Sequence, residues 1–351
     1  MKLKDIAELA NVSPSTVSLV MNGRAGVSES KRKEIIKLLD DYGYPVHSAK
    51  LEVPPAKGGS KCIRFIKCKR HAMLVDGNPG FINSIIDAVE LECHRQGYEL
   101  LITTCSVEQL RGTLRQLRSA SAAGILLLGT ELDARDIAEL PEAPVPMVIL
   151  DNAPPLSNFN CISMNNYAAI YHAVDHLVSY HYRQIGFLAN MFPSNNCLER
   201  RDAFVEAMQQ HGIPCDSSLI YEVHPTPGGA YQSVRSLLDA GTVFPPALVA
   251  NNDSIALGAI KAFKEVEIDV PNDISVIGLD NIPLSSITDP PLTTMEVPCK
   301  EMGIWAVRLL CDQIRYPLSA STKMQISTKL LVRSSTAPYQ EKHVCSRIHD
   351  S

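Results

Sequence analysis

The chain of 351 residues is too long for one small core, so two or three folding units are expected. Its hydrophobic content of 45% and charged content of 20% are those of a globular protein, and its ten cysteines contain no CxxC pair, which argues against a zinc ribbon or a dense disulfide framework. The net charge of −5 alone argues against nucleic acid as a partner, but residues 1–50 carry eight Lys and Arg against six Asp and Glu, so a mildly basic head precedes an acidic body.

Three short helices are predicted in this basic head. Apolar residues at helical spacing predict the first over residues 3–10, and a third is predicted over 28–43. Between them, Ser13 as an N-cap and Pro14 at the first helical position predict a helix over 14–20. Two helices joined by a tight turn indicate a helix-turn-helix domain over 1–46. Patterning alone leaves this DNA reader and a small helical bundle with a solvated face about equally supported.

The string itself favours the DNA reader. KDIAELANVSPSTVSLVMNG followed by VSESKRKEIIKLLDDYGYP resembles the DNA-binding head of the LacI family of repressors in order, spacing and position. The resemblance implies that the second helix enters the major groove and that DNA is contacted by Lys4, Ser13, Ser15, Thr16, Ser18, Leu19, Asn22, Arg24 and Leu51. Leu19 stands where the family often has Arg or His, so it would meet a thymine methyl group instead of donating a hydrogen bond.

A hinge or linker is predicted over residues 47–60. The family folds a short helix here that wedges a leucine into the minor groove of DNA. In this chain Glu52 falls at the position of the wedge leucine, and Pro54 and Pro55 end any helix. The hinge is therefore altered in this chain, or it uses Leu51 in a shifted register.

Strands and helices alternate beyond the linker. Strand-like runs lie at 63–66, 100–103, 124–128, 148–150, 185–188, 248–250 and 275–277. Amphipathic helical stretches lie between them, for example at 82–96, 167–179 and 200–210. This alternation predicts an α/β core built on parallel sheet, which binds ligands at the carboxyl ends of its strands.

Further strings extend the resemblance over about residues 3–336. They include NPGF at 78–81, ERRDAF at 199–204, ANNDSIALGA at 250–259 and PNDISVIGLDN at 271–281. In the LacI family the core is similar to a periplasmic sugar-binding protein, with two doubly wound parallel-sheet lobes and the ligand between them. The resemblance implies a ligand-binding core over 61–340, with one lobe of about 61–160 plus 291–317 and a second of about 161–290 plus 318–340.

The cleft between the lobes is expected to bind its ligand through Asn78, Phe81, Asp151, Arg200, Asn252 and Asp280. Arg200 opens an R-x-x-A-F string where the family has R-x-x-G-F, and its planar guanidinium suits ligand oxygens. Asp280 ends a buried strand and can accept two sugar hydroxyls, while Asn252 offers a donor and an acceptor. Phe81 would stack on the apolar face of a sugar ring.

Two further aspartates leave alternatives open. Asp151 closes a strand, where its carboxylate either meets the ligand or caps a turn. Asp253 is expected to cap the helix that starts at Ser254.

One segment departs from the family's pattern. CIRFIKCKRHAMLVDGN, ending at Asn78, is several residues longer than the usual connection from strand to pocket. It carries Arg64, Lys67, Lys69, Arg70 and His71. Two interpretations stay open: a solvated extension of an edge strand, or bases that reach the cleft and favour an anionic ligand such as a phosphorylated sugar.

The resemblance implies a sequence-specific transcription regulator, a repressor, controlled by a sugar or a sugar phosphate. Two heads on a homodimer would read two operator half-sites, and closure of the cleft would change their spacing. A dimer is expected because the final APYQEKHVCSRIHDS lacks the leucine heptads that make family tetramers. No cofactor and no metal are expected.

The same sequence bears on three other classes of protein. A transport binding protein is disfavoured because Asp5 and Glu8 interrupt any signal sequence, and no apolar run reaches 18 residues, so a cytoplasmic protein is expected. An enzyme is disfavoured because the sequence has no GxSxG, HExxH or P-loop motif. The alternative that stays open is a cytosolic module that binds a sugar or a corepressor protein without an operator-specific role.

Overall fold

The computed structural model describes residues 3–21, 26–41, 61–117, 122–192, 194–317 and 320–341. The chain divides into two compact units, Met1–Gly58 and Gly59–Ser351. None of the helices in the described ranges is long and apolar enough to cross a membrane.

The small unit contains the three predicted helices. They are α1 (Leu3–Leu9), α2 (Pro14–Met21) and α3 (Glu29–Asp41). Their inward faces share one core, made of Ile6, Ala7, Ala10, Val17, Val20, Ile35 and Leu39. Asn11 adopts the left-handed conformation (φ 49°) that turns the chain between α1 and α2, as expected for a residue type that tolerates it. The predicted hinge over 47–60, including Leu51 and Glu52, lies outside the described residues.

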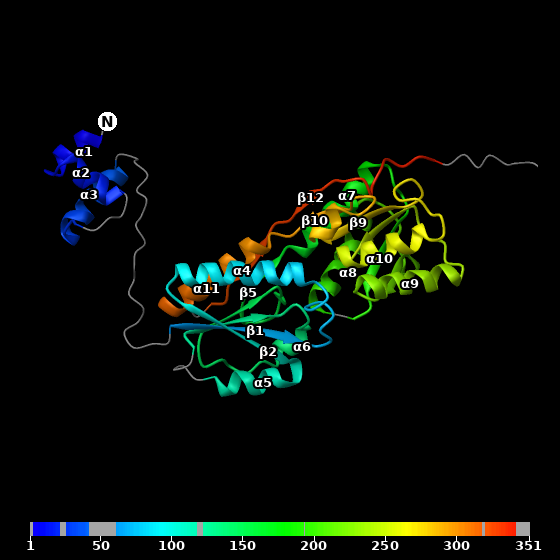
Figure 1. Ribbon diagram of the computed structural model, residues 1–351, viewed down its shortest axis with the longest axis horizontal. Coiled ribbons are helices and arrows are strands. Elements are labelled where there is room, and N and C mark those ends of the chain that lie inside the picture. The colour runs from blue at the N-terminus through cyan, green and yellow to red at the C-terminus, as the bar shows by residue number, and fades with distance from the viewer. Residues whose placement is uncertain are drawn as a thin grey trace, which may run out of the picture. The chain divides into compact units, whose positions relative to one another are not determined.

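The first lobe of the large unit is built on a six-stranded sheet in the order β11-β5-β4-β3-β1-β2, and all of its strands are parallel. These are β1 (Cys62–Lys69), β2 (Glu99–Ser106), β3 (Gly124–Leu128), β4 (Met147–Leu150), β5 (Asn160–Met164) and β11 (Lys323–Ile326). Helices α4 (Pro79–Arg95) and α11 (Cys299–Arg315) cover one face, and α5 (Val107–Gln116) and α6 (Ala134–Ala138) cover the other (Figure 1). Because both faces are covered, the central strand GILLL is buried throughout.

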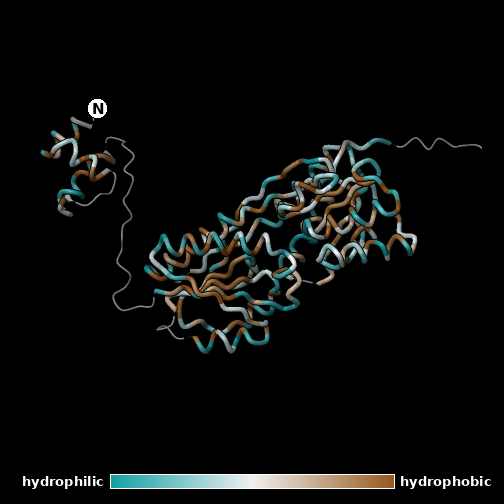
Figure 2. The backbone as a smooth tube through the Cα atoms, in the orientation of Figure 1, coloured by the Kyte–Doolittle hydropathy of each residue, from teal (hydrophilic) through white to brown (hydrophobic). Residues whose placement is uncertain are grey.

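The second lobe repeats this plan in the order β12-β10-β9-β8-β6-β7, where only β12 is antiparallel to its neighbour. Its strands are β6 (Ile185–Asn190), β7 (Ile220–Val223), β8 (Ala247–Ala250), β9 (Ser275–Asp280), β10 (Thr293–Glu296) and β12 (Lys329–Leu331). Helices α7 (Asn166–Ser179) and α8 (Asn195–Gln210) lie on one face, and α9 (Pro227–Asp239) and α10 (Asp253–Lys264) lie on the other. Short 3₁₀ helices occupy Ser217–Leu219 and Pro283–Ser286. Figure 2 shows apolar strands inside both lobes. The strand orders confirm the predicted pair of doubly wound parallel-sheet lobes.

The chain crosses between the lobes three times: after β5, after β10 and after β11. The predicted boundaries at 161, 291 and 318 therefore fall a few residues too early, since β5 and β11 belong to the first sheet and β10 belongs to the second. These three strands have four or five residues and contain polar side chains, so they lack the apolar run that marked the other strands.

Helices α9 and α10 pack so closely that no side chain fits at Gly258 between them. A Cβ added at Gly258 would lie 2.4 Å from the carbonyl oxygen of Pro227 and 2.7 Å from Cβ of Ala230. Gly258→Ala should therefore lower the free energy of unfolding by about 1–3 kcal/mol, measured by urea denaturation of the full chain. Gly228→Ala is the matched control, because a Cβ there meets nothing within 4 Å, and it should be neutral or stabilising by up to about 1 kcal/mol. Similar losses for the two variants would contradict the packing argument.

Candidate functional site

A cavity lies between the two lobes, where the carboxyl ends of β3, β4, β8 and β9 converge. Its lining comprises Met73, Leu74, Gly77, Asn78, Phe81, Thr130, Asp151, Ser194, Asn196, Cys197, Arg200, Pro225, Asn251, Asn252, Ser254 and Asp280. All six residues predicted to bind ligand are in this set. The free space between the side chains is about 30 Å³, room for about two water molecules, so the lobes are closed on each other here.

Arg200 is the cation of the cavity, and it is held rigidly. It lies on α8, is only 7% exposed, and donates from Nε to Oδ1 of Asn166 at 2.8 Å. One Nη donates to the carbonyl oxygen of Asn251 at 2.8 Å, and the other lies 3.3 Å from Sδ of Met164. Since Met164 ends β5 in the first lobe and Asn251 follows β8 in the second, the guanidinium contacts both lobes.

Asp151 is the anion contributed by the first lobe. It follows β4 in a left-handed conformation (φ 60°) and is buried. Thr130 Oγ1 donates to Oδ2 at 2.7 Å, and Nδ2 of Asn196 donates to the carbonyl oxygen at 2.9 Å and to Oδ1 at 3.3 Å. Burial raises the pKa of Asp151 to about 6, against the opposing effects of the Thr130 hydrogen bond and the Arg200 charge. The carboxylate thus accepts from the cavity-lining side chains of Thr130 and Asn196, and among the described residues it caps no turn.

Asp280 is the anion contributed by the second lobe. It ends β9 with φ 122°, and Nδ2 of Asn78 donates to its Oδ2 at 2.8 Å, which ties the lobes together. Burial raises the pKa of Asp280 well above its usual value, and the charges of Asp253 and Asp151 act in the same direction. The Arg200 charge opposes them. Asn78 also caps α4 through Oδ1, which accepts from the backbone N–H of Phe81 at 3.4 Å.

Asn252, and not Asp253, caps the start of α10. Asn252 is the N-cap, since its Oδ1 accepts from the N–H of Ile255 at 2.9 Å, and Asp253 is already the first helical residue. The buried Asp253 carboxylate instead accepts from Thr294 Oγ1 at 2.6 Å and from the N–H of Ile282 at 2.9 Å. The expectation that Asp253 caps the helix was wrong because α10 begins one residue earlier than expected. Asp253 anchors the turn that follows Asp280.

The basic segment before Asn78 does not bring its bases to the cavity. Lys67 and Lys69 pair with Asp76 at 3.6 and 2.6 Å, and Arg70 pairs with Asp136. Arg64 donates to Thr103 Oγ1 at 2.9 Å, and none of the five bases is among the described cavity-lining residues. The hypothesis that they reach the cleft is therefore wrong for Arg64, Lys67, Lys69 and Arg70. The His71 ring, although it is not among the cavity-lining residues, lies 5.0 Å from the ring of Phe192 in the facing lobe. The edge-strand interpretation is wrong as well, because β1 lies between β3 and β2.

Several cavity residues were missed by sequence reasoning, although two carried a signal. Asn196 lies one helical turn before Arg200, and Thr130 is the second residue after the buried strand β3. No sequence pattern pointed to Asn251 apart from its position next to Asn252. Its Oδ1 is nevertheless buried without a hydrogen-bond partner among the described residues. Met73 and Leu74 belong to the long connection, whose course the sequence does not define.

The candidate nucleic-acid interface lies on α2. Ser13 caps this helix, because its Oγ accepts from the N–H of Thr16 at 3.2 Å and lies 2.7 Å from Oγ of Ser15. Ser15 and Ser18 are exposed and Leu19 is half-buried, while Val17 and Val20 pack inward. The side chain of Lys4, and the residues Asn22, Arg24 and Leu51, lie outside the part of the chain that the structure describes. The DNA contacts of all these residues stay predictions.

Comparisons with known proteins agree with both units. Residues 2–45 match the family described as bacterial regulatory proteins, lacI family, and residues 174–336 match the periplasmic binding protein-like domain. The transcriptional repressor PurR of Aliivibrio salmonicida is 31% identical, over 89% of this chain and 92% of its own length. PurR of Photobacterium profundum is 30% identical, over 95% and 98% respectively.

Solved structures share the fold. A complex of the transcriptional regulator CelR with cellobiose has a TM-score of 0.70 at 25% identity, covering 95% of this chain and 99% of that one. The lac repressor dimer bound to operator and an anti-inducer also has a TM-score of 0.70, at 24% identity, covering 96% and 99%.

The raised pKa of Asp151 predicts a pH effect on stability. The folded-state pKa of about 6 exceeds the ordinary 3.8, so this group's stabilising contribution is complete below about 3.8 and is lost as pH rises through about 6. Between pH 5 and pH 7 it should lower the free energy of unfolding by about 1 kcal/mol. Asp151→Asn should remove that part of the pH dependence, measured by urea denaturation at both pH values. Asp239→Asn, at an exposed carboxylate on α9, is the control, and equal pH dependence of Asp151→Asn and the wild type would refute the assignment.

Proposed function

Since the chain belongs to the LacI family of DNA-binding transcription regulators, we propose that a neutral, hydroxyl-rich ligand such as a sugar closes its interlobe cavity and thereby controls repression. The observation that carries the proposal is the grouping of Asp151, Asp280 and Arg200 in one closed cavity. Two carboxylates accept hydroxyl hydrogens, and one guanidinium donates to ring or hydroxyl oxygens.

The charge balance of the cavity favours a neutral ligand over an anionic one. A phosphate group would meet two carboxylates and a single fixed cation that already donates to Asn166 and Asn251. Lys67, Lys69 and Arg70 of the preceding segment are paired with acids outside the cavity, so they do not offset this repulsion. Amide and hydroxyl groups of Asn78, Asn196 and Thr130 supply the uncharged hydrogen-bonding surface that a polyol requires.

We assign control of repression to closure of the lobes. The three crossings between the lobes are the natural hinges, and the hydrogen bond from Asn78 to Asp280 is made only when the two lobes meet. A ligand that contacts both lobes binds the closed form more tightly and shifts the population toward it. Because such coupling is reciprocal, operator DNA changes ligand affinity by the same factor.

DNA recognition is assigned to α2 in a homodimer. The exposed Ser15 and Ser18, the cap Ser13 and the half-buried Leu19 lie on the helix that the family inserts into the major groove. The lac repressor with the same fold is a dimer bound to operator, which supports two heads reading two half-sites. The head matches those of repressor relatives, and this match speaks against the alternative of a binding module that has no operator-specific role.

Replacing the fixed cation should uncouple the sensor from its ligand. Arg200→Met keeps most of the side-chain volume but removes every donor, so we expect at least a tenfold loss of sugar affinity by calorimetry, about 1.4 kcal/mol or more. Arg201→Met is the matched control, because Arg201 is 42% exposed on the same helix and pairs with Glu222. Operator affinity without ligand should be kept in both variants. Unchanged sugar binding by Arg200→Met would remove the arginine from the proposed site.

The preference for neutral ligands is tested by matched pairs of sugars and their phosphate esters in a thermal-shift screen. A ligand present at 100 times its dissociation constant adds about 2.7 kcal/mol to the free energy of unfolding, which gives a clear rise in Tm. We expect a neutral sugar to produce the rise and its ester to produce less. Stronger stabilisation by the ester would overturn the charge argument.

A further inference from the structure

The segment of residues 70–77, which we name the wall loop, joins β1 to the N-cap of α4 and lines the cavity with Met73 and Leu74. These two apolar side chains face a lining that is otherwise mainly polar. The loop has no sheet partner, so its backbone N–H groups need other acceptors. Its conformation therefore depends on what accepts from it.

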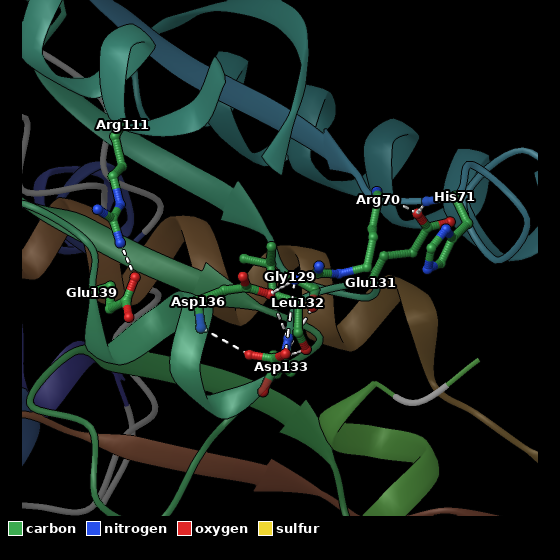
Figure 3. Close-up of polar contacts among 10 residues, drawn as sticks. Arg70, His71, Arg111, Gly129, Glu131, Leu132, Asp133, Asp136 and Glu139 are labelled. Carbon is green, nitrogen blue, oxygen red and sulfur yellow. Dashed lines mark hydrogen bonds and ion pairs between the residues drawn. The ribbon is translucent and has the colours of Figure 1, made fainter. Parts of the chain in front are cut away.

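Glu131 meets that need with one buried carboxylate. Its Oε2 accepts from the N–H groups of Arg70, His71 and Ala72 at 2.7, 2.9 and 3.0 Å, and its Oε1 accepts from those of Leu74 and Val75 at 2.9 and 3.0 Å. Glu131 is 4% exposed and follows β3, and its side chain extends to the loop backbone (Figure 3). Five charge-assisted hydrogen bonds to one carboxylate fix the loop around the left-handed Ala72 (φ 59°).

The outer contacts of the loop hold it at both ends and against the opposite lobe. Arg70 pairs with Asp136 on α6 and lies 3.8 Å from Asp133, the residue that caps α6 (Figure 3). On the other side, the His71 ring lies 5.0 Å from the ring of Phe192 in the second lobe. A Cβ at Gly77 would come within 3.4 Å of the Thr226 methyl group, also in the second lobe. The wall loop thus closes one side of the cavity against the facing lobe.

We propose that the wall loop determines ligand specificity by limiting the ligand to one sugar ring with an apolar face, and that Glu131 is the residue that positions it. This inference rests on the proposed function of the cavity. Met73 and Leu74 line one side of the cavity with apolar side chains, which suit the C–H face of a sugar ring and offer no hydrogen-bond partner to the hydroxyl groups of a second ring. Glu131 is not among the residues that line this cavity, and both of its carboxylate oxygens accept from the loop backbone, so it acts on the ligand through the loop.

The first test needs no ligand. In the full chain, Glu131→Gln replaces one acceptor oxygen by an NH₂ group that faces backbone donors. Amide hydrogen exchange over residues 70–75 should accelerate at least tenfold in this variant. Glu139→Gln is the matched control, since Glu139 lies at the end of α6, is 63% exposed and pairs with Arg111 (Figure 3). Unchanged exchange in Glu131→Gln would overturn the positioning role, whatever the ligand is.

The second test uses ligand size. The test compares a monosaccharide that stabilises the wild type with a disaccharide that contains the same sugar. Calorimetry gives the ratio of the two affinities for each variant. Glu131→Gln should reduce the preference for the monosaccharide at least tenfold, while operator affinity without ligand stays at the wild-type value. Met73→Ala and Leu74→Ala, which keep Glu131, should shift the ratio in the same direction.

The outcomes separate the two proposals. One result would be that all three variants change the Tm and yet keep the wild-type ratio of monosaccharide to disaccharide affinity. That result would show that Glu131 only stabilises the fold, and it would overturn the specificity role of the wall loop. If no neutral sugar binds the wild type, the proposed ligand class fails, and the exchange experiment still decides the positioning role of Glu131.

Discussion

The closed interlobe cavity encloses two carboxylates and one guanidinium, and the sensor depends on how these charges are balanced. A buried charge costs several kcal/mol unless it is paired and hydrogen-bonded, and one cation cannot neutralise two anions. The imbalance raises the pKa of Asp151 to about 6 and that of Asp280 well above its usual value. The closed form is therefore stabilised by anything that donates hydrogens to these carboxylates, whether a proton or a ligand hydroxyl. This makes the equilibrium between open and closed lobes responsive to a small molecule.

The fold brings these groups together because every strand that contributes to the cavity runs in the same direction within its sheet. Asp151 follows β4, Asp280 ends β9 and Asn251 follows β8, so each projects from the carboxyl end of a strand. Positive φ angles at Asp151 and Asp280 turn the chain sharply at these points. Behind them the geometry is fixed by packing: a Cβ at Gly278 would lie 2.2 Å from Oδ1 of Asp253, the carboxylate that holds the turn after Asp280.

Sequence patterns predicted what depends on local periodicity and on strand ends. They gave the three helices of the head and the long apolar strands, and the polar residues after buried strands pointed to Asp151, Asn252 and Asp280 at the ligand edge of the sheets. Asn78, Phe81 and Arg200 came instead from the resemblance to the LacI family. Sequence patterns failed where the outcome depends on partners distant in the chain. The bases at Lys69 and Arg70 looked free because their nearest sequence neighbours carry no acid, yet Asp76 and Asp136 pair with them in the fold. Short strands with polar residues, such as β10, were missed because their neighbours in the sheet, not their own pattern, make them strands.

Closure of the cavity is secured from two separate sides, which favours an all-or-none transition. On one side Asn78 donates to Asp280, and on the other the wall loop places His71 against Phe192. Asn78 directly follows the wall loop and caps α4, so both contacts depend on one short stretch of backbone. A ligand that strengthens either contact thus strengthens the other, since neither survives separation of the lobes. The carboxylate of Glu131, although outside the cavity, fixes this stretch before any ligand arrives, and a preformed wall reduces the ordering entropy that binding would otherwise have to offset.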